Sequence, residues 1–334
     1  MAALPQANRR AGTLMSTIAI TGATGFIGGH LVERLHRRGH RVLAFGRRPD
    51  PHLPPGVSYA RWDIARDPPP PIDAGVDAVI HCAASVSDWA PYHEQYRANV
   101  RGIAQVMQVF AGAGQFILIS TASVYDPARP RSMLQETDRY GARYPNAYGR
   151  TKMLAERVVV ESGRPNCAIV RPHIVYGPRD TTLLPRLLAA RRVGWLPVIG
   201  DGESRISLTG IENLADAIEL ILPRRFGCEI FNIADARTDT LDAMLTALFE
   251  ALGLSVRFLH LDRRLALASA TALEWAYRTL RLPKAPPLTL YLISQIADDY
   301  TLDIAKARAM LGYAPRSDYR DGFAALGAWY RVPR

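Results

Sequence analysis

The chain has 334 residues, of which 48% are hydrophobic, and carries a net charge of +10. This length and composition exclude a disordered chain and allow one large domain with a smaller second one. The basic residues are spread along the chain without a nucleic-acid-binding motif, so the charge does not indicate a nucleic-acid partner. No apolar run reaches the roughly 18 residues of a membrane-spanning helix.

The N-terminus and the cysteines bear on where the protein works. Residues 1–15 lack the apolar core of a secretory signal, and we expect them to form a disordered leader. Cys82, Cys167 and Cys228 are an odd number without metal-ligand spacing. They indicate reduced thiols, no metal site and a cytoplasmic protein.

Strand and helix patterns alternate along the first two thirds of the chain. Residues 16–23 are an apolar run that ends in glycine, residues 27–40 have helical periodicity, and residues 41–47 are typical of a second strand. Further strands are expected at 77–84, 115–120, 167–177 and 228–234, and further helices at 96–114, 147–162 and 212–222. The alternation predicts an α/β fold with a doubly wound parallel sheet, a Rossmann fold.

The pattern changes after Gly177, where apolar helix candidates are separated by proline and glycine breaks. We therefore predict a dinucleotide-binding domain over residues 16–178 and 206–235. Residues 179–205 and 236–334 are expected to form a smaller, mostly helical substrate-binding lobe.

The turn "TGATGFIGG" (21–29) follows the first strand and opens the first helix. Gly22 permits a tight turn, Gly25 lets the backbone approach a pyrophosphate, and Gly28 allows the helix to pack closely on the strand. The helix N-terminus supplies N–H groups to the phosphates. Together with Thr24, Phe26 and Ile27, these glycines form the predicted cofactor-binding turn.

The segment "NAYGRTK" (146–152) places Tyr148 and Lys152 four residues apart, on one face of a predicted helix. A nearby ammonium is expected to lower the pKa of the phenol. The phenol could then exchange a proton with a carbonyl or alcohol oxygen while hydride moves. The alternative is a surface tyrosine beside a solvated lysine.

These motifs resemble the extended branch of the short-chain dehydrogenase/reductase superfamily, which includes nucleotide-sugar epimerases and 3β-hydroxysteroid dehydrogenase-like enzymes. The resemblance runs from about Thr17 nearly to the C-terminus. It implies that Tyr148 is the catalytic acid/base and that Lys152 also binds the nicotinamide ribose. It aligns the catalytic hydroxyl with Thr121 in "ILISTASVY", where the alternatives are a turn-capping threonine and Ser123 as a substrate contact.

The resemblance also implies a set of supporting and cofactor-binding residues. Asn99, in "ANVRGI", would support the geometry of the active site. Asp63 and Ile64 would contact the adenine. The remaining positions are the small residues Ala83, Ala84 and Ser85 beside the cofactor, and the turn Pro172, His173 and Ile174 at the nicotinamide.

Cofactor choice is expected to depend on the end of the second strand. An acidic residue there would select NAD, but "AFGRR" places Arg47 and Arg48 at this position. Because arginine suits a 2′-phosphate, we predict NADP(H), with NAD(H) as the alternative.

The substrate prediction depends on the C-terminal segments. Segments 196–222 and 302–316 resemble the 3β-hydroxysteroid dehydrogenase-like group, which includes sterol-4α-carboxylate dehydrogenases and 2-alkyl-3-oxoalkanoate reductases. We expect oxidoreduction of a β-hydroxy or β-keto group on an apolar, sterol-like or long-chain acyl substrate. The apolar helix candidate 263–282 could close the lobe over its own core, line the substrate pocket or contact a membrane surface.

Two other functions remain as alternatives. One is a nucleotide-sugar epimerase or reductase, and the other is a non-catalytic dinucleotide-binding protein. Dehydration is disfavoured, because Ala122 and Ser123 stand where a dehydratase has Asp-Glu. A homodimer is also expected as one form of assembly.

Overall fold

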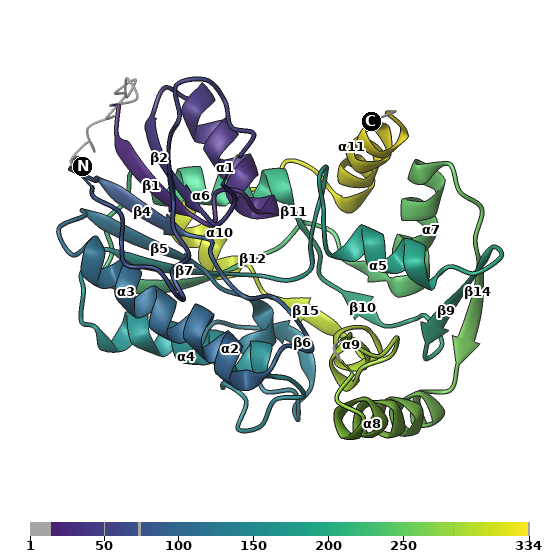
Figure 1. The fold of residues 1–334 in the computed structure, drawn as a ribbon. Coiled ribbons are helices and arrows are strands. Elements are labelled where there is room, and N and C mark those ends of the chain that lie inside the picture. Colours follow the sequence, from purple (N-terminus) through teal and green to yellow (C-terminus); the bar gives the residue numbers. More distant parts are fainter. Residues whose placement is uncertain (1–14, 50, 73–74, 283, 333–334) are drawn as a thin grey trace, which may run out of the picture.

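A seven-stranded sheet forms the centre of the computed structural model, which describes residues 15–49, 51–72, 75–282 and 284–332 (Figure 1). Neighbouring strands are all parallel, in the order β12-β7-β5-β4-β1-β2-β3. In that order the strands span Cys228–Ile233, Cys167–Pro172, Gln115–Ile119, Ala78–His81, Thr17–Thr21, Arg41–Gly46 and Ser58–Arg61. The predicted doubly wound α/β fold is confirmed. The predicted leader lies outside the described residues, apart from Met15.

Helices cover both faces of this sheet (Figure 1). One face packs against α1 (Phe26–Arg37), α6 (Ile211–Ile221) and α10 (Ala305–Leu311). The other face packs against a continuous helical segment and α4 (Ala147–Glu161). Strands β4, β5 and β7 are buried along their whole length, as parallel strands covered on both faces should be.

The continuous helical segment differs from the helix predicted over residues 96–114. It comprises α2 (Tyr92–Tyr96), a π-helical turn η1 (Arg97–Arg101) and α3 (Gly102–Val109). It therefore begins and ends earlier than predicted. The π-helical turn contains Asn99, one of the predicted supporting residues.

The strand order reverses between β1 and β4, which lie side by side at the middle of the sheet. Ligands of such sheets bind in the crevice outside the carboxyl ends of the strands at this point. The glycine turn follows β1 and the segment containing Ala83 follows β4. The fold thus brings these two predicted cofactor-binding segments together.

Helices make up most of the regular structure in the smaller lobe, as predicted, but the lobe also contains short strands, most of which were not predicted from the sequence. Strands of two to five residues carry too little periodicity to be recognised in the sequence. The pairs are β8 (Val175–Tyr176) with β11 (Thr209–Gly210) and β9 (Trp195–Ile199) with β14 (Arg257–Leu261); the four-stranded sheet comprises β13 (Asp239–Thr240), β10 (Arg205–Ile206), β15 (Tyr300–Leu302) and β6 (Arg131–Leu134). The helices are α5 (Leu183–Ala190), α7 (Leu241–Leu252), α8 (Arg263–Thr279), α9 (Leu290–Ile296) and α11 (Tyr319–Arg331).

Part of the C-terminal segment packs with the large sheet instead of the small lobe. Tyr300, Leu311 and Tyr313 belong to the same buried core as α1 and α6. Helix α10 also contacts β12. The packing here departs from the predicted boundary, which assigned all of 236–334 to the lobe; the division into two lobes otherwise stays a prediction.

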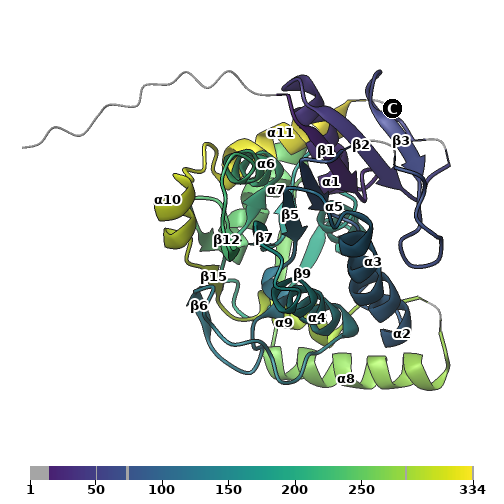
Figure 2. The ribbon, with the colours of Figure 1, turned by 90° about the vertical axis from the view of Figure 1, so that its left-hand side faces the viewer.

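Helix α8 lies at the edge of the molecule, away from the central sheet (Figure 2). It packs against α9 through a small apolar cluster that includes Ala266, Ala270 and Ile293. Within the described part of the chain, no helix is both long and apolar enough to cross a membrane.

Candidate active site

The glycine turn has room for glycine alone at two positions. Gly22 adopts φ +69°, and a Cβ there would lie 2.6 Å from the backbone nitrogen of Ala83. A Cβ on Gly28 would collide with the carbonyl oxygen of Gly22. The backbone of the turn, the start of α1 and the segment after β4 are therefore in close contact.

The N-terminus of α1 is open to an anion. Gly25 is its N-cap, no side chain caps it, and its first turn, which includes Phe26 and Ile27, contains no acidic residue. The first N–H groups of a helix lack intrahelical partners. Thr24 lies against the end of β2, since a Cβ on Gly46 would be 2.9 Å from its Oγ1. These residues fit the pyrophosphate of a dinucleotide.

Arg47 and Arg48 directly follow β2, and both side chains are exposed. The Arg48 carbonyl accepts a hydrogen bond of 2.6 Å from the Tyr59 hydroxyl, which fixes the backbone at this point. Both guanidinium groups are thus carried on the segment beside the glycine turn, where they were expected.

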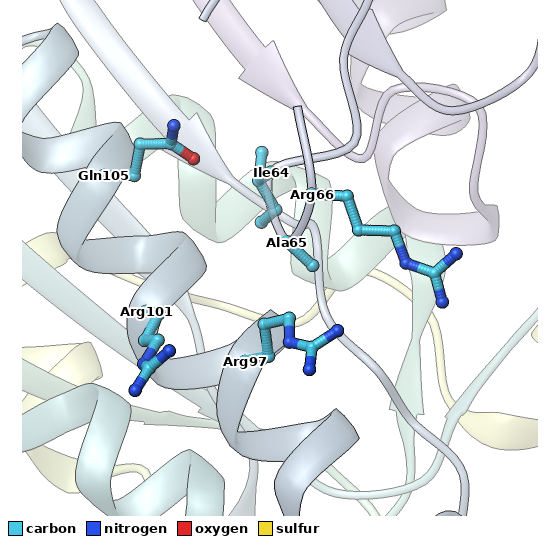
Figure 3. A pocket seen from close by; sticks show the side chains of 6 residues that line it. All are labelled: Ile64, Ala65, Arg66, Arg97, Arg101 and Gln105. Carbon is cyan, nitrogen blue, oxygen red and sulfur yellow. The ribbon is translucent and has the colours of Figure 1, made fainter. Parts of the chain in front are cut away.

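Asp63 and Ile64 form a tight turn after β3. The Asp63 N–H donates to Asp67 Oδ2, and its Oδ1 accepts from the Ala65 N–H, each at 3.0 Å. A cavity of about 630 Å³ opens beside this turn. Figure 3 shows the residues that line it, which include three arginines and no acidic residue: Ile64, Ala65, Arg66, Arg97, Arg101 and Gln105.

Asn99 connects the segment after β4 to α4. Its Oδ1 accepts the Ser85 N–H at 2.7 Å, and its Nδ2 donates to the Ser85 carbonyl at 3.1 Å and to Thr151 Oγ1 at 3.0 Å. Asn99 is buried. It therefore holds the Ala83–Ser85 segment in a fixed position relative to the helix that carries Tyr148.

Lys152 is buried between α4 and the end of β5, and its Nζ donates a 2.7 Å hydrogen bond to the Ile119 carbonyl. Burial lowers the pKa of Lys152 to about 8, while Glu156, one turn further along α4, acts in the opposite direction. The ammonium consequently titrates within the range in which enzymes are assayed.

Tyr148 differs from the expectation in one respect. Burial raises the pKa of its phenol well above the ordinary value, and a hydrogen bond with the Thr121 side chain offsets this only in part. Loss of solvent, and not the charge of the lysine, therefore sets the direction of this shift. The direction of this shift favours a neutral phenol, which can donate a proton.

Three hydroxyl groups gather around Tyr148. Thr121 caps the short 3₁₀-helix η2 (Ala122–Val124), so it has the capping geometry as well as its hydrogen bond to Tyr148. The Ser123 Oγ lies 3.2 Å from Thr121 Oγ1 and 3.1 Å from the Tyr291 hydroxyl. The rings of Tyr148 and Tyr291 meet edge to face, with centroids 6.3 Å apart.

Helix α9 brings two residues to this group that the sequence did not reveal, Tyr291 and Gln295. The Gln295 Oε1 lies 3.4 Å from Ser123 Oγ and 3.3 Å from His173 Nε2. His173 is buried, with Nδ1 2.9 Å from the Ser207 carbonyl, and burial lowers its pKa to about 4. It lies in the loop after β7, as expected, and its ring is held by partners from two other segments.

The turn of Pro172, His173 and Ile174 follows β7. Ile174 adopts φ +42°, a strained backbone conformation for a β-branched residue. Such strain persists only where the surroundings enforce it, and it is frequent at ligand sites.

A buried ion pair anchors α4 to β7. The Arg171 Nη2 and Nε lie 2.6 Å and 3.0 Å from the two carboxylate oxygens of Glu156, and both side chains are almost fully buried. Ser120 and Tyr140 also donate hydrogen bonds to Glu156. Because Glu156 follows Lys152 by one turn, the pair fixes the position of the lysine.

The glycine turn beside a hydroxyl cluster with a tyrosine and a lysine defines a dinucleotide-dependent oxidoreductase. Among the residues described, no group of three or more His, Cys, Asp or Glu side chains could hold a metal ion. The chain belongs to the NAD dependent epimerase/dehydratase family, whose model matches residues 18–234.

Similar proteins agree with this class. The chain is 32% identical to a 2-alkyl-3-oxoalkanoate reductase of Stenotrophomonas maltophilia, over 93% of this chain and 98% of that protein. It is 33% identical to a decarboxylating sterol-4-alpha-carboxylate 3-dehydrogenase of Mus musculus, over 58% and 56% of the two chains. Its fold matches MoeE5 in complex with UDP-glucuronic acid and NAD, with a TM-score of 0.70, 25% identity, and coverage of 94% and 99%. The predicted superfamily and enzyme class are confirmed.

Proposed function

We propose that the protein is a ketoreductase that interconverts β-keto and β-hydroxy groups of an apolar, sterol-like or long-chain acyl substrate with NADP(H). The observation that supports this best is the cluster of Tyr148, Thr121 and Ser123, with the buried ammonium of Lys152 bound to the backbone two residues before Thr121. The reductase from Stenotrophomonas maltophilia supports the substrate class.

In the proposed reaction, Thr121 and Tyr148 hold the carbonyl oxygen of the substrate. A nicotinamide cofactor bound at the glycine turn would supply hydride to the carbonyl carbon. The phenol of Tyr148 gives its proton to the oxygen, whose developing negative charge the Thr121 hydroxyl stabilises. Lys152 places a positive charge beneath the site, and Ser123 with Tyr291 orients the substrate. Oxidation follows the same steps in reverse.

An apolar substrate is favoured over a nucleotide sugar because most arginines in residues 179–192 already have partners. A sugar-nucleotide diphosphate needs free cationic groups. Three of the four arginines in residues 179–192 already have partners: Arg179 pairs with Glu33, Arg186 with Asp88, and Arg191 donates to the Ser255 carbonyl. Arg192 and Arg205 remain as exposed candidates, so the epimerase stays the alternative.

A substrate panel tests the proposal. Purified enzyme with reduced cofactor is assayed by nicotinamide absorbance against long-chain β-keto acids, 3-keto sterols and uridine diphosphate sugars. We expect turnover of an apolar ketone, and titration calorimetry of the enzyme–cofactor complex should rank it above the sugar nucleotides. Activity confined to sugar nucleotides would reassign the protein to the epimerases.

The pKa of Lys152 predicts the pH dependence of reduction. Because the ammonium is lost as the pH rises through about 8, we expect kcat/KM to fall above that pH, approaching about tenfold per pH unit. Initial rates with saturating cofactor measure this profile. In Lys152→Met, which has no titrating group there, the residual activity should lack this decline; the same decline in both enzymes would contradict the assignment.

Cofactor choice is proposed to depend on Arg47 and Arg48. We expect Arg47→Asp to weaken NADP(H) binding by about tenfold or more, with little effect on NAD(H), because a paired charge to the 2′-phosphate is lost. Fluorescence titration of both reduced cofactors gives the dissociation constants. The matched control is Arg308→Asp, an exposed arginine on α10 that lies at the opposite edge of the sheet, against β12. Equal constants for the two cofactors in the unmodified enzyme would refute NADP(H) selection.

Assembly as a homodimer and contact with a membrane surface also stay predictions. The exposed side of helix α8 is the candidate surface for membrane contact.

A further inference from the structure

Helix α8 presents an apolar face to solvent. Leu265 and Trp275 are each 70% exposed, far more than large apolar side chains usually are. Ala268 and Ala272 lie between them on the same side of the helix and are exposed as well. The opposite side, with Ala266 and Ala270, packs against α9. The outward side is therefore not needed for the core of the lobe.

Leu280, which follows α8 directly, is 68% exposed and extends this apolar face at its C-terminal end. Leu282 comes two residues later and is 39% exposed. Together, the exposed side chains of Leu265, Ala268, Ala272, Trp275 and Leu280 form the α8 face.

No acidic residue interrupts the α8 face. The single acidic residue of α8 is Glu274, which is buried and accepts hydrogen bonds from the Leu290 N–H at 2.8 Å and from Arg278 at 3.1 Å. Asp262, at the N-cap, accepts hydrogen bonds from the backbone N–H groups of Arg264 and Leu265.

Basic residues stand at both ends of the face. Arg263 and Arg264 open the helix, Arg278 lies in its last turn and Arg281 follows it, all of them exposed. Arg263 pairs with Asp298, and Arg278 with Glu274. The face is thus an uncharged apolar surface bordered by cations.

We propose that the α8 face docks on the surface of a membrane that contains anionic lipid. An amphipathic helix of this kind lies in the interface, with leucine and tryptophan among the acyl chains and arginine at the headgroups. A second copy of the chain is disfavoured as the occupant, because a two-fold contact would bring the basic ends of two α8 helices against each other. The proposal does not depend on the reaction of the enzyme.

The position of α8 gives such docking a use, a point that rests on the proposed function. Helix α8 packs on α9, and α9 carries Tyr291 to the hydroxyl group of Ser123. A membrane bound at α8 would therefore lie one helix away from the proposed site. An apolar substrate could enter from the bilayer.

Co-sedimentation with lipid vesicles tests the docking. The full-length protein is mixed with vesicles of phosphatidylcholine alone or of phosphatidylcholine with phosphatidylglycerol. We expect tighter binding to the mixed vesicles and a loss of this difference as sodium chloride is raised. Leu265→Ser and Trp275→Ser should each weaken binding by roughly tenfold, since each removes one large apolar side chain from the lipid.

Matched variants distinguish docking through the α8 face from non-specific binding to the vesicles. Val160→Ser removes an exposed apolar side chain from α4 and should bind as the unmodified protein does. Arg264→Glu should weaken binding to the mixed vesicles alone. Circular dichroism checks that each variant is folded. Unchanged vesicle binding in the double variant Leu265→Ser with Trp275→Ser would overturn the proposal. A protein that binds no vesicles would also overturn it, and a concentration-dependent dimer abolished by Trp275→Ser would then show that a second copy covers the face.

Discussion

Tyr148→Phe is expected to lower kcat for ketone reduction by roughly 10²–10⁴-fold and to leave cofactor affinity nearly unchanged. The substitution removes only the phenolic hydroxyl, which is the proposed proton donor and the partner of Thr121. The ring and its edge-to-face contact with Tyr291 remain. Steady-state kinetics with a ketone from the substrate panel give kcat, and fluorescence titration gives the dissociation constant of the cofactor.

A second phenylalanine substitution provides the control. Tyr330→Phe removes a hydroxyl from α11, where the side chain is 38% exposed, and should leave kcat unchanged. Normal turnover by Tyr148→Phe would show that the proton comes from another group. A loss of cofactor affinity as large as the loss of kcat would indicate a structural role for the hydroxyl.

Features that depend on residues close together in the sequence could be predicted from it. Gly22 and Gly28 occupy positions that are closed to a Cβ, and their spacing within a strand–turn–helix pattern indicated this. Tyr148 and Lys152 share a helix, so their four-residue spacing was enough to place them on one face. The parallel sheet followed from the alternation of strands and helices, because parallel strands need such crossovers.

Features that depend on contacts between segments far apart in the sequence could not be predicted from it. Tyr291 meets Ser123 from 168 positions away, and Gln295 meets His173 from 122 positions away. Neither α9 residue belongs to a local motif. The four-residue spacing from Lys152 to Glu156 was a signal that could have been used, but its meaning depends on Arg171 in a separate strand.

The direction of the Tyr148 pKa shift depends on burial, which the sequence pattern did not give. The prediction considered the charge of the neighbouring lysine alone. In the folded protein, loss of solvent is the largest influence on the phenol. A neutral phenol is the proton donor that the proposed carbonyl reduction needs.

The buried pair of Glu156 and Arg171 gives the largest expected effect on stability. Glu156→Gln keeps the shape of the side chain but leaves the Arg171 guanidinium buried without its counter-charge. We expect the free energy of unfolding to fall by about 3–5 kcal/mol, because an unpaired charge in the interior is strongly unfavourable. Urea denaturation followed by circular dichroism measures the change. Asp298→Asn, which breaks the exposed pair with Arg263, is the matched control and should cost about 1 kcal/mol or less.

Replacing both partners distinguishes the effect of the charge from that of packing. In the double variant Glu156→Leu with Arg171→Met, no charge is left unpaired, and much of the lost stability should return. Ser120 and Tyr140 would lose an acceptor, so recovery is expected to be incomplete. If Glu156→Gln proved as stable as the unmodified protein, the pair would not anchor α4 to β7. A double variant less stable than either single variant would mean that the pair stabilises the fold beyond the balance of its charges.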